Sequence, residues 1–153
     1  MGFRFIDDIC IGETQEQRSA GKALAACGSQ LARSLPEIPP GCENSFAYRA
    51  PWAIGSGQIP TEEDIVAVHS HIRACLVARF HRNGQAMRIL YGGSVTSSNA
   101  RWILGLSNVG GVLIGGASLM ASDFDAILQV SREMSCAPDA VESAMKAPQS
   151  ASR

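Results

Sequence analysis

Short apolar segments alternate with longer helical patterns four times along this chain, and this alternation limits the folds open to it. The apolar segments cover residues 3–11, 45–48, 88–91 and 111–116, and the helical patterns cover 16–35, 61–80, 97–104 and 122 to at least 130. Apolar strands that alternate with amphipathic helices are typical of a parallel sheet covered by helices. We therefore predict one α/β domain over residues 1–134, with the order β-α-β-α-β-α-β-α.

Local signals support the individual elements. Leu24, Cys27, Leu31 and Leu35 are spaced three and four apart, as on one face of a helix. Thr61 with Asp64 resembles a capping box, with Asp in place of the usual Glu or Gln, and Gly105 is a natural helix end. Residues 135–153 are small and polar, and we expect a flexible tail there.

Charge and composition exclude several classes of function. A net charge of −1 over 153 residues argues against general binding to nucleic acid or to an anionic membrane. No apolar run is long enough to span a bilayer, and the N-terminal MGFRFIDDIC does not have the pattern of a signal peptide. We therefore expect a cytoplasmic protein.

Cysteine and histidine usage predicts no metal site, no disulfide framework and no cofactor. The five cysteines are scattered and form no C-x-x-C pair. His69 and His71 are two residues apart on a predicted helix, so they do not share a face as a metal pair would. We expect both histidines on the helix surface.

Paired glycines follow two of the predicted strands, in LYGGS at 90–94 and LIGGAS at 113–118. Both pairs fall at the carboxyl ends of parallel strands, where α/β folds bind ligands. Glycine lets a ligand approach the backbone closely, and successive free N–H groups can hold an anion. Either pair alone is explained by a tight turn. Both together favour a phosphate site, to which the Ser94 hydroxyl can add a donor, and Gly55 and Gly57 form a third pair in a loop.

Several motifs, in order, resemble the triosephosphate isomerase family. They are CIGETQEQRSAG at 10–21, AYRAPWAIGSG at 47–57, YGGSV at 91–95 followed by Asn99, and LIGGASL at 113–119. The resemblance covers roughly residues 3–130 and implies the second half of a (β/α)₈ TIM barrel, strands five to eight. Such barrels typically need about 250 residues, so the resemblance implies that the first four βα units are absent from this chain.

The resemblance also implies roles for individual residues. The backbone N–H groups of Gly55, Ser94, Gly115 and Gly116 are expected to hold a substrate phosphate. Most of the family's closing loop corresponds to Trp52, Ala53, Ile54, Gly55, Ser56 and Gly57. Glu13 is similar to a glutamate at the end of the family's fifth strand, for which a structural role near that loop is expected.

The family's glutamate base is replaced by Arg49 in this sequence. A guanidinium stays protonated and has no acceptor, so it cannot remove a proton from carbon. Glu43 lies six residues before Arg49 and is no obvious substitute. The family's histidine electrophile belongs to the absent half. We therefore assign no catalytic residue, and give Arg49 two roles of similar weight: an anion donor, or a side chain turned to solvent or paired across an interface.

Half a barrel leaves two sheet edges and an apolar inner face open, which invites pairing with another chain. We predict a homodimer or a dimer of dimers that closes the barrel. The alternatives are a separate first-half chain that completes the barrel and a monomer whose C-terminal helix covers its core. The leading hypothesis is a truncated homologue that binds a phosphate-bearing small molecule without isomerase activity. The alternatives are isomerase activity restored by oligomerisation or a first-half chain, and a non-catalytic interaction module.

Overall fold

A three-stranded parallel sheet forms the centre of the fold. The computed structural model describes residues 8–35, 45–53 and 60–136. Strands β1 (Asp8–Ile11), β2 (Ser45–Tyr48) and β3 (Arg88–Tyr91) lie in the order β1-β2-β3. In the register, Ile9 pairs with Phe46 and Phe46 with Ile89. The α/β class and the parallel sheet expected from the alternation are confirmed.

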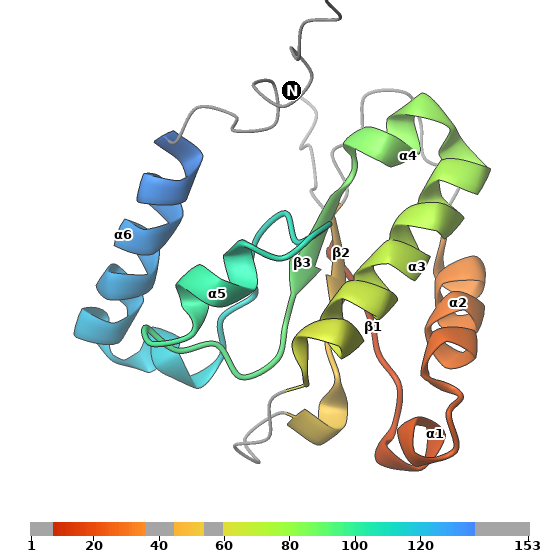
Figure 1. The fold of residues 1–153 in the computed structure, drawn as a ribbon, viewed down its shortest axis with the longest axis horizontal. Coiled ribbons are helices and arrows are strands. Elements are labelled where there is room, and N and C mark those ends of the chain that lie inside the picture. Colours follow the sequence, from red (N-terminus) through yellow and green to blue (C-terminus); the bar gives the residue numbers. More distant parts are fainter. Residues whose placement is uncertain (1–7, 36–44, 54–59, 137–153) are drawn as a thin grey trace, which may run out of the picture.

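Helices follow each strand, as Figure 1 shows. They are α1 (Gln15–Ser19), α2 (Ala23–Ser34), the 3₁₀ turn η1 (Pro51–Ala53), α3 (Glu62–Phe80), α4 (Arg82–Ala86), α5 (Ala100–Leu104), η2 (Gly116–Leu119) and α6 (Ala121–Cys136). Helices α2 and α3 pack against each other and against the sheet. Helix α5 lies between β3 and α6, so α6 is at the outer side of the fold (Figure 1).

The core lies between one face of the sheet and α3. Ile65, Val68, Ile72 and Leu76 repeat every three or four residues along α3 and are buried. They pack with the alternate strand residues that face the helices, which are Ile11, Phe46, Tyr48, Ile89 and Tyr91. The predicted capping box at Thr61 is present, with the Thr61 hydroxyl accepting from the Asp64 N–H and the Asp64 carboxylate accepting from the Thr61 N–H.

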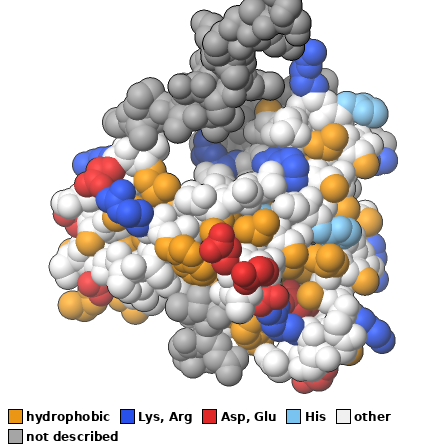
Figure 2. Space-filling model, viewed as in Figure 1, with side chains coloured by type: hydrophobic (Ala, Val, Ile, Leu, Met, Phe, Trp, Pro, Cys, Tyr) orange, Lys and Arg blue, Asp and Glu red, His pale blue; other side chains and the backbone are white. Residues whose placement is uncertain are grey.

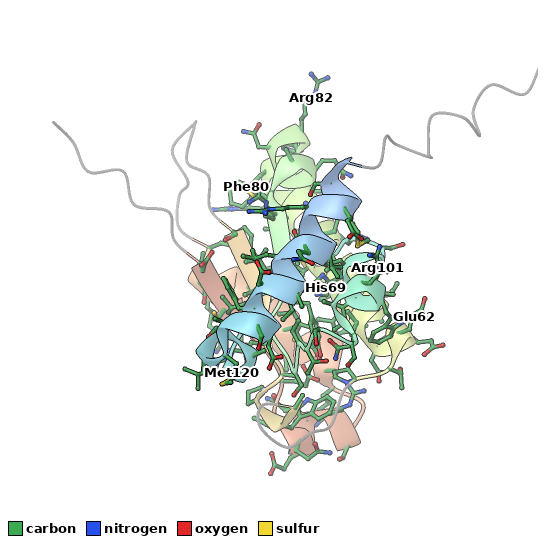
Figure 3. The ribbon with its side chains drawn as sticks, turned by 90° about the vertical axis from the view of Figure 1, so that its left-hand side faces the viewer. Glu62, His69, Phe80, Arg82, Arg101 and Met120 are labelled. Carbon is green, nitrogen blue, oxygen red and sulfur yellow. The ribbon has the colours of Figure 1, made fainter. Side chains whose placement is uncertain are left out.

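His69 is buried, so its predicted place on the helix surface is wrong. Its side chain lies within the body of the molecule (Figure 3). The Nδ1 atom is 3.1 Å from the Asn108 carbonyl oxygen, and the ring meets the Tyr48 ring edge-on at 5.9 Å. Burial lowers the pKa of His69 to about 4, and the nearby Arg73 charge acts in the same direction. Aromatic side chains of the sheet surround the His69 ring, so its burial cannot be predicted from the periodicity of the helix alone.

The helix predicted over residues 16–35 is two helices. Gly21, with φ of +67°, interrupts it in a left-handed conformation that only glycine adopts easily. Lys22 then precedes a second helix that runs to Ser34. The short helix α4 is a further element that the sequence pattern does not indicate.

The last helix, predicted to run at least to Val130, ends at Cys136. We expect a flexible tail from residue 135, but α6 continues through Ser135 to Cys136. The first two residues of the predicted tail are therefore helical. Residues 137–153, which make up the rest of it, lie outside the described residues.

The predicted fourth strand, over residues 111–116, is reduced to a single bridge beside β3. Val112 bridges Tyr91 in parallel orientation. The Tyr91 N–H donates to the Gly111 carbonyl at 2.9 Å, and the Leu113 N–H donates to the Tyr91 carbonyl at 2.8 Å. The segment therefore takes the place of a fourth strand without forming a regular ladder. One further bond to β3 precedes them, from the Gly110 N–H to the Ile89 carbonyl at 2.7 Å, and among the described residues no strand pairs with the outer side of the segment.

The inner face of the sheet is less apolar than predicted. By strand alternation it carries the row Asp8, Ser45 and Arg88, followed by the row Cys10, Ala47 and Leu90. Asp8 and Arg88 are exposed, and the Ser45 hydroxyl donates to the Asp8 carboxylate. Charged residues at the amino end of this face therefore replace part of the apolar surface that a half-barrel was expected to show.

Candidate functional site

A hollow opens at the carboxyl ends of β2 and β3. Its volume is about 220 Å³, and it is lined by Arg49, Gly92, Gly93, Leu113, Ile114 and Gly115. The structure therefore brings together three segments that are far apart in the sequence: the residue after β2, the glycine pair after β3, and the segment beside β3. This is the end of a parallel sheet at which α/β proteins bind ligands.

The first glycine pair forms the floor of the hollow, and its two members differ. The Gly92 N–H donates to the Tyr48 carbonyl at 2.8 Å, so it continues the pairing of β2 with β3. A Cβ atom on Gly93 would lie 2.2 Å from the Tyr91 hydroxyl oxygen, so a larger residue there requires the buried Tyr91 ring to move. Among the hydrogen bonds of the described residues, none is donated by the N–H of Gly93 or Ser94. Those two N–H groups are available to an anion.

The Ser94 hydroxyl has a structural partner, contrary to the prediction that it adds a donor to the site. It donates to the Ala53 carbonyl at 2.7 Å. The Asn99 side-chain amide donates to the Ser94 carbonyl at 2.9 Å. Ser94 thus ties the loop after β3 to η1, and its backbone N–H is the group that remains for ligand binding.

Gly115 lines the far side of the hollow, and Gly116 follows it as the first residue of η2. Both are exposed, and a Cβ atom on either would meet nothing within 4 Å. The Ser118 N–H and hydroxyl both donate to the Gly115 carbonyl, at 2.9 and 2.7 Å, which closes the first turn of η2. Among the described residues, the N–H groups of Gly115 and Gly116 have no backbone acceptor. The free N–H of Gly115 is therefore a further donor at the hollow, and that of Gly116 is the next donor along the chain.

Arg49 occupies the β2 side of the hollow. Its backbone N–H donates to the Ile11 carbonyl at 2.8 Å, and a Cβ atom on Gly12 would lie 1.9 Å from the Arg49 carbonyl oxygen. Its side-chain stem lies over Gly92, since a Cβ atom built there would be 3.4 Å from the Arg49 Cβ. Arg49 is exposed and has no ion pair within the described part of the chain.

Glu13 lies beside the start of the predicted closing loop, fully buried. Its Oε1 atom accepts from the Tyr48 hydroxyl at 3.0 Å and from the Trp52 indole N–H at 3.0 Å. Arg18 is 3.4 Å from the same oxygen, and the Cys27 thiol is 3.7 Å from Oε2. Burial, followed by the Glu13 charge, raises the pKa of Cys27 to about 12 and raises the pKa of Tyr48.

Arg18 links this cluster to α3, a role that the sequence does not indicate. Its guanidinium lies 4.5 Å from the centre of the Trp52 ring and pairs with Asp64. Because Asp64 is 46 residues from Arg18, no local pattern points to the pair. The remaining loop residues, Ile54, Gly55, Ser56 and Gly57, lie outside the described residues, as does Glu43.

The described part of the chain offers neither a metal site nor a membrane span. Residues 8–35, 45–53 and 60–136 contain no group of three or more His, Cys, Asp or Glu side chains able to hold a metal ion. Within the same residues, no helix combines the length and the apolar character needed to cross a membrane.

The parallel sheet, the outer helices and the glycine-lined mouth define part of a (β/α)₈ barrel. Residues 4–131 match the family model described as triosephosphate isomerase. The chain therefore belongs to the triosephosphate isomerase family.

Individual relatives agree with this assignment. Triosephosphate isomerase from Ruegeria sp. (strain TM1040) is 51% identical over 120 residues, which are 78% of this chain and 49% of the relative. The protein of the same name from Rhizobium meliloti is 48% identical over 126 residues, 82% of this chain and 49% of the relative. The crystal structure of triosephosphate isomerase from Bartonella henselae superposes with a TM-score of 0.76 at 40% identity, over 84% of this chain and 52% of that chain. The chain spans about half the length of these relatives.

Proposed function

We propose that this chain binds the phosphate group of a small phosphorylated molecule at the glycine-lined hollow and does not catalyse isomerisation. The observation that carries the proposal is that the backbone N–H groups of Gly93 and Gly115, which both line the hollow, have no acceptor among the described residues. The N–H groups of Ser94 and Gly116, which follow them directly in the chain, have no acceptor there either. Backbone N–H groups that converge on a concavity are favourable to an anion. Gly55, for which the family resemblance implies the same role, is proposed as a further donor.

The lack of proton transfer follows from Arg49. The resemblance places this residue where the family has its glutamate base, and a guanidinium has no lone pair with which to accept a proton. The purified chain is therefore expected to give no interconversion of glyceraldehyde 3-phosphate and dihydroxyacetone phosphate. Turnover that disappears in an Arg49→Ala variant would overturn this part of the proposal. Turnover that requires an added first-half fragment would favour the alternative of a two-chain isomerase.

Phosphate binding is tested by thermal unfolding with increasing glycerol 3-phosphate. A ligand that binds only the folded chain stabilises it by about 2.7 kcal/mol at about one hundred times its Kd. A Gly115→Asp variant should lose this stabilisation, because the added charge repels phosphate in a position with open space around it. Ser107→Asp adds the same charge at an exposed position before the segment beside β3. This variant should keep the stabilisation by glycerol 3-phosphate. An unchanged melting temperature in the parent chain would favour a non-catalytic interaction module.

We further propose that two copies close the barrel together. Strand β1 and the segment at 110–113 are the two edges of the described sheet. Helix α6 presents exposed Phe124 and Leu128, which are one turn apart, and the exposed apolar residues Leu119 and Met120 lie directly before its first residue. Figure 2 shows hydrophobic side chains at the lower left of the molecule, over this region. In a closed pair, α6 of one copy lies beside α2 of the other.

Charge supports a second copy as the partner. Helix α6 carries Asp123, Asp125 and Glu133 against Arg132, whereas α2 with its N-cap carries Lys22 and Arg33 and no acidic residue. Light scattering on a sizing column should give an even number of chains.

Two matched variants test the contact at α6. Phe124→Asp should shift the mass toward the monomer, because it places a charge on the apolar face. Arg82→Asp should not, because Arg82 lies at the opposite end of the molecule from Met120 at the start of α6 (Figure 3). A monomeric parent chain at all concentrations would contradict closure by a second copy.

A further inference from the structure

Arg49 and the free N–H groups line one hollow from opposite sides. Arg49 follows β2, the Gly92–Gly93 floor follows β3, and Gly115 follows the segment beside β3. Neighbouring strands are about 4.8 Å apart, so the backbones at the two sides are separated by roughly two such spacings, about 10 Å. A phosphate held on the Gly115 side therefore leaves room for a second group of the same small molecule on the Arg49 side.

The Arg49 stem is positioned by its surroundings. Its backbone is fixed by the hydrogen bond to Ile11 and by the close contact with Gly12. The stem then crosses the floor at Gly92, where a Cβ atom would lie 3.4 Å from its Cβ and 3.5 Å from its Cγ. The base of the Arg49 side chain is therefore already restricted. As a result, the side chain loses less conformational entropy when it binds a ligand.

The guanidinium also lacks a carboxylate partner within the described residues, in contrast to Arg18 and Arg101. Arg18 pairs with Glu13 and Asp64, and Arg101 pairs with Glu133. Arg49 therefore brings to the hollow a positive charge that no described carboxylate compensates. A planar guanidinium binds a carboxylate through two parallel hydrogen bonds, which a neutral carbonyl or hydroxyl group does not match.

We propose that the site prefers small phosphorylated carboxylic acids over phosphorylated aldehydes, ketones or alcohols, with Arg49 as the carboxylate anchor. This inference rests on the proposed phosphate site. The phosphate occupies the N–H groups of Gly93, Ser94, Gly115 and Gly116, and the carboxylate lies toward Arg49 across the floor at Gly92. The replacement that removes the base thus changes the selectivity of the site toward ligands with a second negative charge.

The test compares two probes of matched size, 3-phosphoglycerate and glycerol 3-phosphate, by titration calorimetry at fixed ionic strength. The carboxylic acid is expected to bind at least about tenfold more tightly, as a charge-assisted bidentate pair allows. Arg49→Gln should remove this difference while glycerol 3-phosphate still binds. Arg49→Lys, which keeps the charge without the planar fork, should retain part of it.

Arg82→Gln is the matched control and should leave both affinities unchanged. Arg82 begins α4, which precedes β3, so it lies at the amino end of the sheet, whereas the hollow lies at the carboxyl end (Figure 3). Equal affinity for the two probes in the parent chain would overturn the role of Arg49 and leave the phosphate site standing. Binding of neither probe would overturn the proposed function itself. A preference for the acid that persists in Arg49→Gln would assign the carboxylate to another group.

Discussion

The indole N–H of Trp52 donates to the buried carboxylate of Glu13 at 3.0 Å, and the Tyr48 hydroxyl donates to the same oxygen. One carboxylate therefore joins the end of β1, the end of β2 and the turn η1. The start of the predicted closing loop is held through a side chain that lies 39 residues earlier in the chain.

Replacing Glu13 by Gln is expected to lower the free energy of unfolding by about 2 kcal/mol, because a buried charged acceptor is lost. The new amide hydrogens would also face the Cys27 thiol, which is a weak acceptor. Urea titration followed by circular dichroism measures the change. Glu63→Gln, in the exposed first turn of α3, is the control. Equal midpoints for both variants would show that the Glu13 cluster adds little to stability.

Gly12→Ala is expected to destabilise the chain by about 3 kcal/mol or to prevent folding. Its Cβ atom would lie 1.9 Å from the Arg49 carbonyl oxygen, and backbone atoms cannot move aside cheaply. Gly116→Ala makes the same chemical change where nothing lies within 4 Å, and it should fold with little loss of stability. The melting temperatures of the two variants are compared with that of the parent chain. An unchanged melting temperature for Gly12→Ala would contradict the close packing of the ends of β1 and β2.

His69 is expected to make the chain less stable in acid. Its folded pKa of about 4 is below the ordinary value of 6.5, because burial disfavours the charged ring. The unfolded chain therefore binds a proton more readily between these values. Stability is full above pH 6.5 and falls as the pH is lowered toward 4, by about 3 kcal/mol from this residue.

His69→Asn, which can still donate to the Asn108 carbonyl, should reduce this dependence when urea midpoints are measured from about pH 7.5 to about pH 4.5. His71→Asn changes a partly exposed histidine on the same helix and should keep the dependence. Identical pH profiles for the parent chain and His69→Asn would show that His69 is not responsible.

Cys27 is expected to resist alkylation in the folded chain. It is fully buried and its pKa is raised to about 12, so the reactive thiolate is rare. Brief treatment with iodoacetamide at about pH 8, followed by peptide mass analysis, should modify exposed Cys10 much faster than Cys27. In urea the two rates should become similar. Rapid native labelling of Cys27 would contradict the closed packing around Glu13.

The α/β class is predictable from the sequence because apolar residues repeat with different periods in strands and in helices. These periods can be read from neighbouring residues without knowledge of the tertiary contacts. Gly21 shows where this approach fails: a glycine inside a helical pattern does not reveal whether its φ is positive. His69 shows a second limit, since its burial depends on Tyr48 and Tyr91 from two strands. Gly92, Gly93 and Gly115 line one hollow, while their role in phosphate binding stays a prediction. The partner of the Ser94 hydroxyl could not be inferred from neighbours in the sequence.

The division of the glycine-pair amides into bonded and free groups has a consequence for hydrogen exchange. The Gly92 amide, bonded to the Tyr48 carbonyl, should exchange slowly with deuterated solvent, together with the Arg49 amide bonded to Ile11. The amides of Gly93, Ser94, Gly115 and Gly116 should exchange quickly in the unliganded chain. A bound anion would slow the second group and leave the first unchanged, so the exchange pattern marks the position of a ligand residue by residue.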